Sequence, residues 1–186
     1  MVLDEDLYIR LTARNDIENL IARYCIACDD RRIEELLAMF TEDAYFGHVD
    51  GVHGKSGRDG VREHYETSLG NMGPSYHWSH DRLIEVDPED ANKATGTILA
   101  HCETSNAGVA YVAAIRYNDR YRRVDGVWKF AWRGYQFLYF VPAEQYGQAL
   151  GMEKRVWRYG AWQLPDLPEP LDSWKEFRAK IEKAAA

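Results

Sequence analysis

Two carboxylates, Asp29 and Asp30, end the apolar stretch YCIACDDRR. The apolar side chains before them recur at helical spacing, which predicts a helix with one buried face. An acid is almost never fully buried without a partner, so each carboxylate must be solvated, cap a helix or pair with another group. Asp30 is placed to cap the helix that follows. Asp29 has no such explanation and is therefore a candidate for chemistry.

Histidines are the second chemical feature, with His77 and His80 in the stretch HWSHD. A histidine with a pKa of about 6.5 can accept a proton at neutral pH, and a carboxylate on its other ring nitrogen fixes the tautomer. Such a pair removes a proton but supplies no nucleophile, which favours elimination or isomerisation over acyl transfer. Taken from the residues alone, His77 fits a solvated or core histidine better than a catalytic one.

The histidines and cysteines give little support for a metal or an organic cofactor. His77 and His80 are three residues apart in a strand pattern, so they are expected to point to opposite faces and not to share an ion. Cys25 and Cys28 have CxxC spacing but lie within a helical pattern, and we interpret them as reduced core cysteines. The sequence also has no GxGxxG or GxxxxGK[ST] stretch to hold a nucleotide. We therefore expect no cofactor and no metal.

Composition narrows the class of protein further. The chain has 186 residues, of which 46% are hydrophobic and 13% aromatic, enough for one domain with a substantial core. A formal net charge of -7 disfavours nucleic acid as a partner. No apolar run is long enough to span a membrane, and the first residues, MVLDEDLYIR, are acidic where a signal peptide is basic. We expect a cytoplasmic protein with no membrane partner.

The pattern of the chain is helices first and strands afterwards, which predicts α+β packing of helices on an antiparallel sheet. Before residue 75 the expected elements are two helices joined by a tight turn, a short strand and another short helix, at residues 17–28, 33–40, 44–49 and from 60 onward. Later, residues 95–103 alternate with a two-residue period. Residues 109–124 and 127–141 flank Asp125-Gly126, a strong hairpin signal. Together these strands predict a long, curved sheet.

Strict alternation along the last strand would place its side chains on two different faces. Trp128, Phe130 and Trp132 would share one face, which suits packing against helices or a contact between subunits. Arg133 and Tyr135 would share the other face, which lines a cavity or meets solvent.

The chain after Pro142 reads as a tail. Three prolines in WRYGAWQLPDLPEPL exclude regular structure there, and a short helix is expected at residues 173–183. Trp157, Trp162 and Trp174 indicate that the tail is not free in water. It is expected to fold over the domain, over a neighbouring subunit or over the mouth of a pocket.

The order of elements, together with YCIACDDRRIEELLAMFTEDAYF and YNDRYRRVDGVWKFAWRGYQFLYFVP, resembles the SnoaL-like family of the nuclear transport factor 2-like superfamily. The second stretch is especially similar to hexachlorocyclohexane dehydrochlorinases, and HWSHDRLIEVDPEDANKATG resembles bile-acid 7-alpha-dehydratases. The resemblance covers roughly residues 10–142. It implies a cone-shaped α+β barrel with a mixed, mostly antiparallel sheet in residues 1–142. Residues 143–186 would be a C-terminal extension, a lid or a subunit contact, and not an independent domain.

The resemblance also implies a set of site residues. The catalytic base of the dehydratase and dehydrochlorinase members is a histidine paired with an aspartate of the first helix, and these match His77 and Asp29. Tyr24 matches a tyrosine of the bile-acid enzymes and is expected to donate a hydrogen bond. Arg133 matches an arginine of the dehydrochlorinases and would stabilise negative charge. A plain core residue is the alternative for Tyr24, and a surface salt bridge is the alternative for Arg133.

Four further residues are expected to contact the substrate, namely His101, His48, Tyr45 and Tyr135. His101 lies where scytalone dehydratases keep a second histidine, and its strand phase is expected to turn it toward the cone. His48 stands where those enzymes have a tyrosine, and Cys102 where the bile-acid enzymes have an acid. These departures leave the substrate and the leaving group open.

The resulting hypothesis is a cofactor-independent lyase that removes water, halide or formaldehyde from a hydrophobic cyclic or aromatic substrate. A ketosteroid-type isomerase and a non-catalytic ligand-binding or assembly module are the alternatives. The family resemblance implies a homo-oligomer, with a trimer favoured over a dimer, and Trp128, Phe130 and Trp132 are the expected contact.

Overall fold

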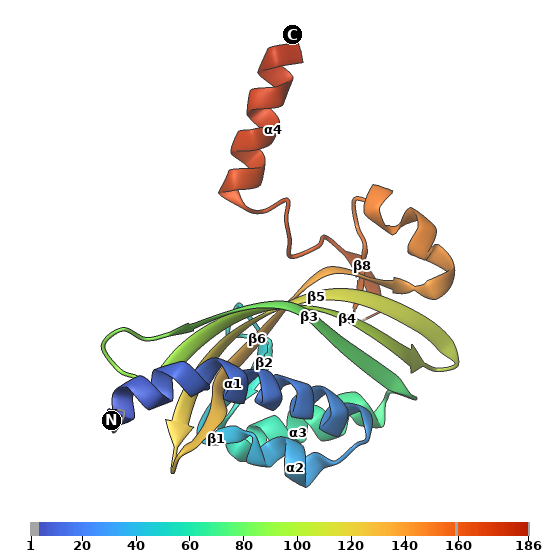
Figure 1. Cartoon of the computed structure of the whole chain (residues 1–186). Coiled ribbons are helices and arrows are strands. Elements are labelled where there is room, and N and C mark those ends of the chain that lie inside the picture. Colours follow the sequence, from blue (N-terminus) through green and yellow to red (C-terminus); the bar gives the residue numbers. More distant parts are fainter. Residues whose placement is uncertain (1–3, 159, 186) are drawn as a thin grey trace.

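Three helices lie beneath one face of a curved sheet, and a C-terminal extension lies on the other side of it in this computed structural model, which describes residues 4–158 and 160–185 (Figure 1). The helices are α1 (Glu5–Asp29), α2 (Ile33–Ala38) and α3 (Gly57–Gly70). The strands of the sheet are β1 (Phe40–His48), β2 (Gly54–Ser56), β3 (Ser75–Val86), β4 (Lys93–Asn106), β5 (Val109–Val124) and β6 (Val127–Pro142). No helix in the described part of the chain is both long and apolar enough to cross a membrane.

The sheet is mixed and mostly antiparallel. Its strands follow the order β2-β1-β6-β5-β4-β3, and within this path only β1 and β6 run parallel. Asp125 and Gly126 both have positive φ, 49° and 80°, as the two central residues of a tight hairpin turn require, and they join β5 to β6. The predicted α+β class, the hairpin and the cone-shaped arrangement are confirmed.

The start of the chain differs from the expectation in one detail. Asp30 follows the last residue of α1 and its backbone N–H donates to carbonyls of that helix. The residue that precedes α2 is Arg32, and α2 has no side-chain cap. The expectation that Asp30 caps the second helix is therefore wrong, because α2 begins two residues later than a cap at Asp30 requires.

A β-bulge at Ala131 reverses the facing of the residues that follow it in β6. Phe130 pairs with Tyr121 of β5, and Arg120, the residue before Tyr121, pairs with Trp132. Ala131 is thus an extra residue without a partner, and alternation restarts after it. A second irregularity, at residue 138, does the same further along the strand.

The bulge places Arg133 on the same concave face as Trp128 and Phe130, contrary to strict alternation. Trp128 and Phe130 are buried in the core under the helices. Trp132 lies on the outer face and stacks on Tyr45, with ring centroids 5.5 Å apart. The expectation that these three tryptophan and phenylalanine side chains form one exposed contact is wrong, because the extra residue breaks the two-residue period.

Arg133 forms a buried ion pair in the core. Its Nη1 donates to Oδ2 of Asp119 at 3.0 Å, and both side chains are at most 1% exposed. The guanidinium also lies over three aromatic rings, at 4.0 to 4.6 Å from the centroids of Tyr24, Tyr117 and Phe130. Burial raises the pKa of Asp119 to about 6, against the opposing effects of Arg133 and the Tyr121 hydroxyl. A surface salt bridge is thereby excluded for Arg133.

The C-terminal extension packs on the outer face of the sheet with its first half. It consists of η1 (Ala143–Gly151), β7 (Val156–Arg158), β8 (Ala161–Gln163) and α4 (Asp172–Ala185). Strand β7 pairs with β6 and β8, and Ala149 joins a small outer cluster around Tyr139 and Val141. The expectation of no regular structure in WRYGAWQLPDLPEPL is wrong for the part before the first proline, where β7 and β8 form a hairpin that brings Trp157 and Trp162 together.

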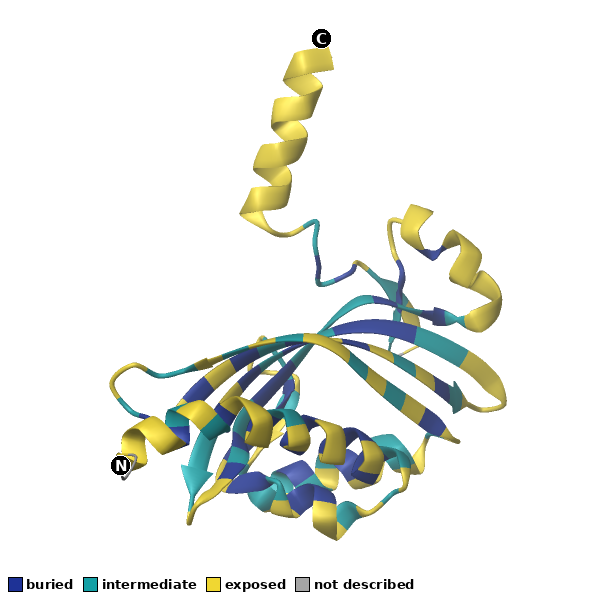
Figure 2. Ribbon diagram, in the orientation of Figure 1, coloured by how far each residue is buried: buried dark blue, intermediate teal, exposed yellow. Residues whose placement is uncertain are grey.

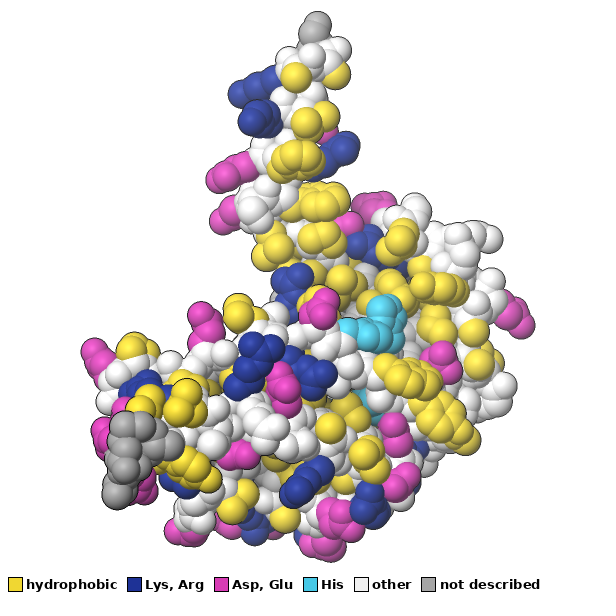
Figure 3. Space-filling view, in the orientation of Figure 1, with side chains coloured by type: hydrophobic (Ala, Val, Ile, Leu, Met, Phe, Trp, Pro, Cys, Tyr) yellow, Lys and Arg dark blue, Asp and Glu magenta, His cyan; other side chains and the backbone are white. Residues whose placement is uncertain are grey.

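Helix α4 stands clear of the rest of the molecule (Figure 3). None of its described residues is buried, as Figure 2 shows by its uniform colour. Trp174 is 40% exposed, so within a single chain this tryptophan is not covered as the sequence predicted.

We expect the Arg133–Asp119 pair to show strong non-additivity. Replacing Arg133 alone by Met should lower the free energy of unfolding by about 3–5 kcal/mol, because it leaves the Asp119 carboxylate buried without a partner. The double replacement Arg133→Met with Asp119→Leu should cost less, because no buried charge remains. Urea unfolding monitored by circular dichroism measures both. The exposed pair Lys93–Asp90 is the matched control and should show a coupling of at most about 1 kcal/mol; a similar coupling in both cycles would contradict the prediction.

Candidate active site

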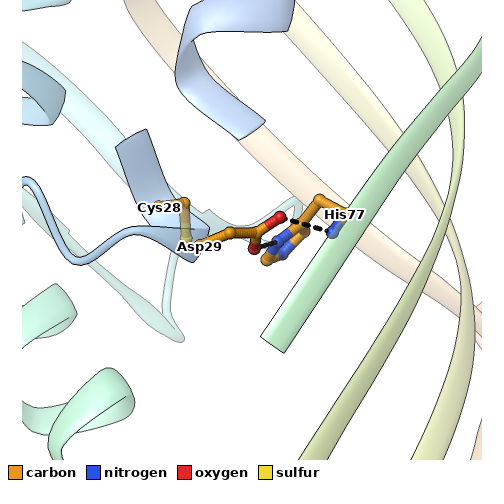
Figure 4. Close-up of side chains that lie close together, drawn as sticks. All are labelled: Cys28, Asp29 and His77. Carbon is orange, nitrogen blue, oxygen red and sulfur yellow. Dashed lines mark hydrogen bonds and ion pairs between the residues drawn. The ribbon is translucent and has the colours of Figure 1, made fainter. Parts of the chain in front are cut away.

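His77 and Asp29 meet where α1 ends beside the beginning of β3. Nδ1 of His77 lies 2.6 Å from Oδ1 of Asp29, and the backbone N–H of His77 donates to Oδ2 at 2.8 Å (Figure 4). The carboxylate is therefore fixed by two contacts with one residue. The side chains are 12% and 18% exposed, so both are sheltered but remain accessible.

The position of the pair on the helix sets its electrostatics. Asp29 is the last residue of the 25-residue helix α1, whose C-terminal end carries partial negative charge. A carboxylate there is disfavoured unless donors face it, whereas an imidazolium is favoured. A carboxylate can only accept, so the neutral form of His77 carries its hydrogen on Nδ1 and has its lone pair on Nε2. The arrangement can accept a proton at Nε2 and stabilise the resulting cation.

Arg31 and Ser75 hold the carboxylate in place, and sequence reasoning missed both. The Ser75 hydroxyl donates to Oδ1 of Asp29 at 3.3 Å, and Nη1 of Arg31 donates to Ser75 Oγ at 2.8 Å and to the Cys28 carbonyl at 2.9 Å. Nη2 of Arg31 donates to the Gly73 carbonyl at 2.6 Å. The signal was present in the sequence, because Arg31 follows Asp29 by two residues in a tight turn, but the contact with β3 is visible only in three dimensions.

Small side chains surround His77 on the concave face. His77 is paired across the sheet with Cys102, then Ala113, then Phe140. The next inward row passes through Ala100 and Ile115 to Phe137. Phe137 and Phe140 stack with centroids 5.5 Å apart. The concave face therefore presents a floor of small apolar groups between the imidazole and a wall of aromatic rings.

Tyr24 and Arg133 belong to a deeper part of the core. The Tyr65 hydroxyl donates to the Tyr24 hydroxyl at 2.8 Å, and the Tyr24 ring lies under the Arg133 guanidinium. Burial raises the pKa of Tyr24 well above its ordinary value, so the hydroxyl stays protonated. The hydrogen bonds and ring contacts of both residues are with this buried cluster and not with the dyad. Tyr24 lies one helical turn before Cys28 and has the burial and contacts of a core residue, which is the alternative that the sequence left open for it.

His101 faces away from the cone, so the expectation that it lines the interior is wrong. It follows Ala100 and precedes Cys102, both inward-facing, and its side chain is exposed on the outer face. There its Nδ1 lies 2.7 Å from Nε2 of His80. Since His80 thus lies on the outer face and His77 on the concave one, the expected opposite facing of His77 and His80 is confirmed.

The remaining predicted contacts are divided between the two faces. Tyr45 lies on the outer face, where its hydroxyl donates to the His48 carbonyl at 2.7 Å, so it does not line the interior as expected. Its neighbours Ala44 and Phe46 are buried in the core, so alternation along β1 turns Tyr45 outward. Tyr135 faces the concave side and contacts Phe137. His48 lies beside Tyr135 at the end of β1, with ring centroids 6.0 Å apart.

A groove on the outer face is separate from the dyad. It is lined by residues of strands β3 to β6, including Thr97, Asn118, Arg120 and Trp132. The sheet itself lies between this groove and His77. We therefore assign no part of the candidate active site to it.

Within residues 4–158 and 160–185, two groups of side chains have metal-ligand composition. The first consists of Cys28, Asp29 and His77, whose ligand atoms lie within 4.8 Å of one another. Burial and the Asp29 charge raise the pKa of the Cys28 thiol to about 12, so it resists the deprotonation that metal binding needs. The dyad hydrogen bonds also occupy Asp29. The second group consists of His48, Asp50 and His53 on the β1–β2 hairpin.

Residues 10–134 match the SnoaL-like domain. The chain belongs to this family. A curated relative, the gamma-hexachlorocyclohexane dehydrochlorinase of Sphingobium indicum, is 27% identical over 134 residues, which are 72% of this chain and 85% of the relative. The crystal structure of a type 2 hexachlorocyclohexane dehydrochlorinase is similar with a TM-score of 0.65 and 25% identity, covering 73% of this chain and 91% of that one.

A scytalone dehydratase-like protein from Novosphingobium aromaticivorans has the same fold, with a TM-score of 0.66 and 22% identity over 73% of this chain and 91% of that one. The family resemblance seen in the sequence is confirmed. The family match ends at residue 134, so the extension described above lies outside it.

We expect Arg31 to stabilise the junction that holds Asp29. Replacing Arg31 by Ala should lower the free energy of unfolding by about 2–3 kcal/mol, because hydrogen bonds from a charged donor to three backbone carbonyls and Ser75 are lost. Replacing it by Gly should cost about 1 kcal/mol less, since Arg31 has a φ of 60° and glycine adopts that conformation without strain. Urea unfolding measures both variants.

The neighbouring Arg32, whose exposed side chain pairs with Glu35, is the matched control for Arg31. Arg32→Ala should change the stability by no more than about 0.5 kcal/mol. If Arg31→Ala is no more harmful than Arg32→Ala, the proposed contacts do not support the junction.

Proposed function

We propose that the protein is a cofactor-independent lyase in which His77, oriented by Asp29, removes a proton from a hydrophobic cyclic or aromatic substrate. The observation that carries the proposal is the 2.6 Å contact between His77 Nδ1 and Asp29 Oδ1, reinforced by the backbone bond to the same carboxylate. This geometry leaves Nε2 as the free base and gives the imidazolium a fixed counter-ion.

The reaction that fits the dyad is elimination. Nε2 of His77 takes a proton from a substrate carbon, the C–H electron pair forms a carbon–carbon double bond, and the leaving group departs with its own bonding pair. Hydroxide that leaves in this way takes up the proton from His77 and is released as water. Halide is an equivalent leaving group. For formaldehyde, the base takes the proton of a CH2OH group, and the O–H electron pair forms the C=O bond of formaldehyde as the carbon–carbon bond breaks. The pair from that bond forms the new carbon–carbon double bond, and hydroxide departs from the neighbouring carbon and takes up the proton from His77 as water.

The surroundings of the imidazole favour a flat apolar substrate. Cys102 and Ala113 give room next to His77, while Phe137, Phe140 and Tyr135 offer ring faces at the other side of the floor. The dehydrochlorinase relatives act on hexachlorocyclohexane, as their name states, which is also an apolar ring. Water loss is the first choice here, in line with the resemblance of the sequence to dehydratases.

The proposal predicts that turnover depends on His77 and Asp29. Wild type, His77→Ala and Asp29→Asn are incubated in EDTA with a pooled panel of hydroxylated cyclic ketones, halocycles and lignin-type diols, and products are followed by mass spectrometry. Loss of water, halide or formaldehyde is expected for wild type, with at least about a hundredfold slower reaction for His77→Ala, the effect of removing a general base. His101→Ala, on the outer face, should retain the wild-type rate.

Equal product from wild type and His77→Ala would remove His77 from the mechanism. An isomer of unchanged mass in place of an elimination product would favour the isomerase, which uses the same base. Circular dichroism of each variant shows whether the fold is kept.

A steric test addresses the substrate floor. Cys102→Leu should raise the KM for a ring substrate at least about tenfold while leaving the dyad intact, because the larger side chain fills the space beside His77. The matched control is His101→Leu, the adjacent residue of β4 on the opposite face, which should leave KM unchanged. Equal effects of the two substitutions would place the substrate elsewhere.

A further inference from the structure

Three side chains of the β1–β2 hairpin converge on one point that has no part in the dyad. Nδ1 of His48 lies 2.9 Å from Oδ2 of Asp50, and Nδ1 of His53 lies 2.6 Å from the same oxygen. One ligand atom from each residue falls within 4.8 Å of the others. Two imidazole nitrogens and a carboxylate form a donor set suited to first-row transition metals.

The backbone of the hairpin fixes this arrangement. The other carboxylate oxygen of Asp50, Oδ1, accepts hydrogen bonds from the backbone N–H groups of Val52 at 2.8 Å and His53 at 3.0 Å. The His48 N–H donates to the His53 carbonyl at 2.8 Å. The turn therefore leaves Oδ2 directed at the two imidazoles, and the three donors are held in position by bonds that do not involve Oδ2.

The contacts of the two ring nitrogens of His48 indicate a cation between Nδ1 and the Asp50 carboxylate. Its Nδ1 faces Asp50, while its Nε2 is 3.1 Å from Oδ1 of Asp166 in the extension. The backbone N–H of Asp50 donates to Nδ1 at 3.3 Å, so Nδ1 turns its lone pair toward the turn, where Oδ2 of Asp50 repels it. This repulsion is removed when a positive species lies between Nδ1 and Asp50. A metal ion can fill that role, because Nδ1 of His48 and Nδ1 of His53 both lie against the same oxygen of Asp50.

We propose that the β1–β2 hairpin binds one transition-metal dication of the Zn²⁺, Co²⁺ or Ni²⁺ class through His48, Asp50 and His53. Asp166 takes the position of the carboxylate that commonly faces the second nitrogen of a metal-binding histidine. Bonds of about 2.0–2.1 Å in a tetrahedral site place neighbouring donor atoms about 3.3 Å apart. Oδ2 of Asp50, now 2.9 Å and 2.6 Å from the two nitrogens, would therefore separate from them by about 0.4 Å and about 0.7 Å. His53 is 59% exposed, which leaves an open side for a water ligand.

The ion would fasten the extension to the barrel. Asp166 is already linked to β6, because its carboxylate accepts the Phe137 N–H at 2.7 Å and its own N–H donates to the Phe137 carbonyl at 2.9 Å. A metal on His48 Nδ1 fixes the proton on Nε2, next to Asp166, and so couples the hairpin to this link. The site is structural, and it is independent of the lyase proposal.

The test uses the full chain without an affinity tag, treated with EDTA and dialysed. Co²⁺ is titrated while its visible absorption is followed, and Zn²⁺ binding is measured by isothermal titration calorimetry. One equivalent is expected to bind wild type. Asp50→Asn and His53→Ala should abolish the one-equivalent cobalt spectrum. Asp166→Asn should keep the stoichiometry and weaken the affinity roughly 10- to 100-fold.

Two controls separate this site from the other histidines of the chain. The double variant His80→Ala with His101→Ala removes the outer-face pair, and His77→Ala removes the group beside Cys28; both variants should bind the ion as wild type does. The proposal is overturned if wild type shows no saturable binding, or if Asp50→Asn and His53→Ala bind like wild type. Because these readouts do not involve turnover, failure here leaves the lyase proposal unaffected, and the converse also holds.

Discussion

The Asp29 carboxylate joins the C-terminal end of α1 to the first residues of β3, and the concave side of the molecule is arranged around that contact. A negative charge at this end of a helix is disfavoured by the helix dipole. It is stabilised here by His77 and Ser75, and Arg31 ties the same turn to β3. Because these donors come from β3, the helix and the strand are placed relative to each other by the group that also orients the imidazole.

The two irregularities of β6 shape the interior in which this contact lies. Without the extra residue at Ala131, Arg133 would face outward and could not reach Asp119. Without the one at residue 138, Phe137 and Phe140 could not both face the concave side. Bulges also bend a strand, so the same features that select the inward side chains curve the sheet around them. The buried ion pair results from the first bulge of β6, and the stacked Phe137 and Phe140 rings result from the second.

The C-terminal extension adds a second layer to this arrangement. Its β7–β8 hairpin and η1 cover part of the outer face, while Asp166 reaches the edge of β6 beyond the end of β1. There it faces His48, so the hairpin between β1 and β2 and the extension meet beside Tyr135. Segments that are far apart in the sequence thus share one edge of the cone. The proposed metal site lies at this edge, beside Tyr135 of the concave face.

The sequence by itself determined the helices before strands, the Asp125-Gly126 hairpin, the family and the expectation that Asp29 pairs with His77, because these depend on local spacing or on matched motifs. It also indicated Asp29 through its place after an apolar helix face. Only the tertiary structure decided that His101 and Tyr45 face outward, that Arg133 is buried with Asp119, and that His48 meets Asp166. For Arg133 the physical reason is that one unpaired residue in a strand exchanges its two faces, and nothing in the identity of Ala131 indicates it. Contacts of Arg31 with β3 and of His53 with His48 likewise depend on how turns close in space, which residue spacing does not specify.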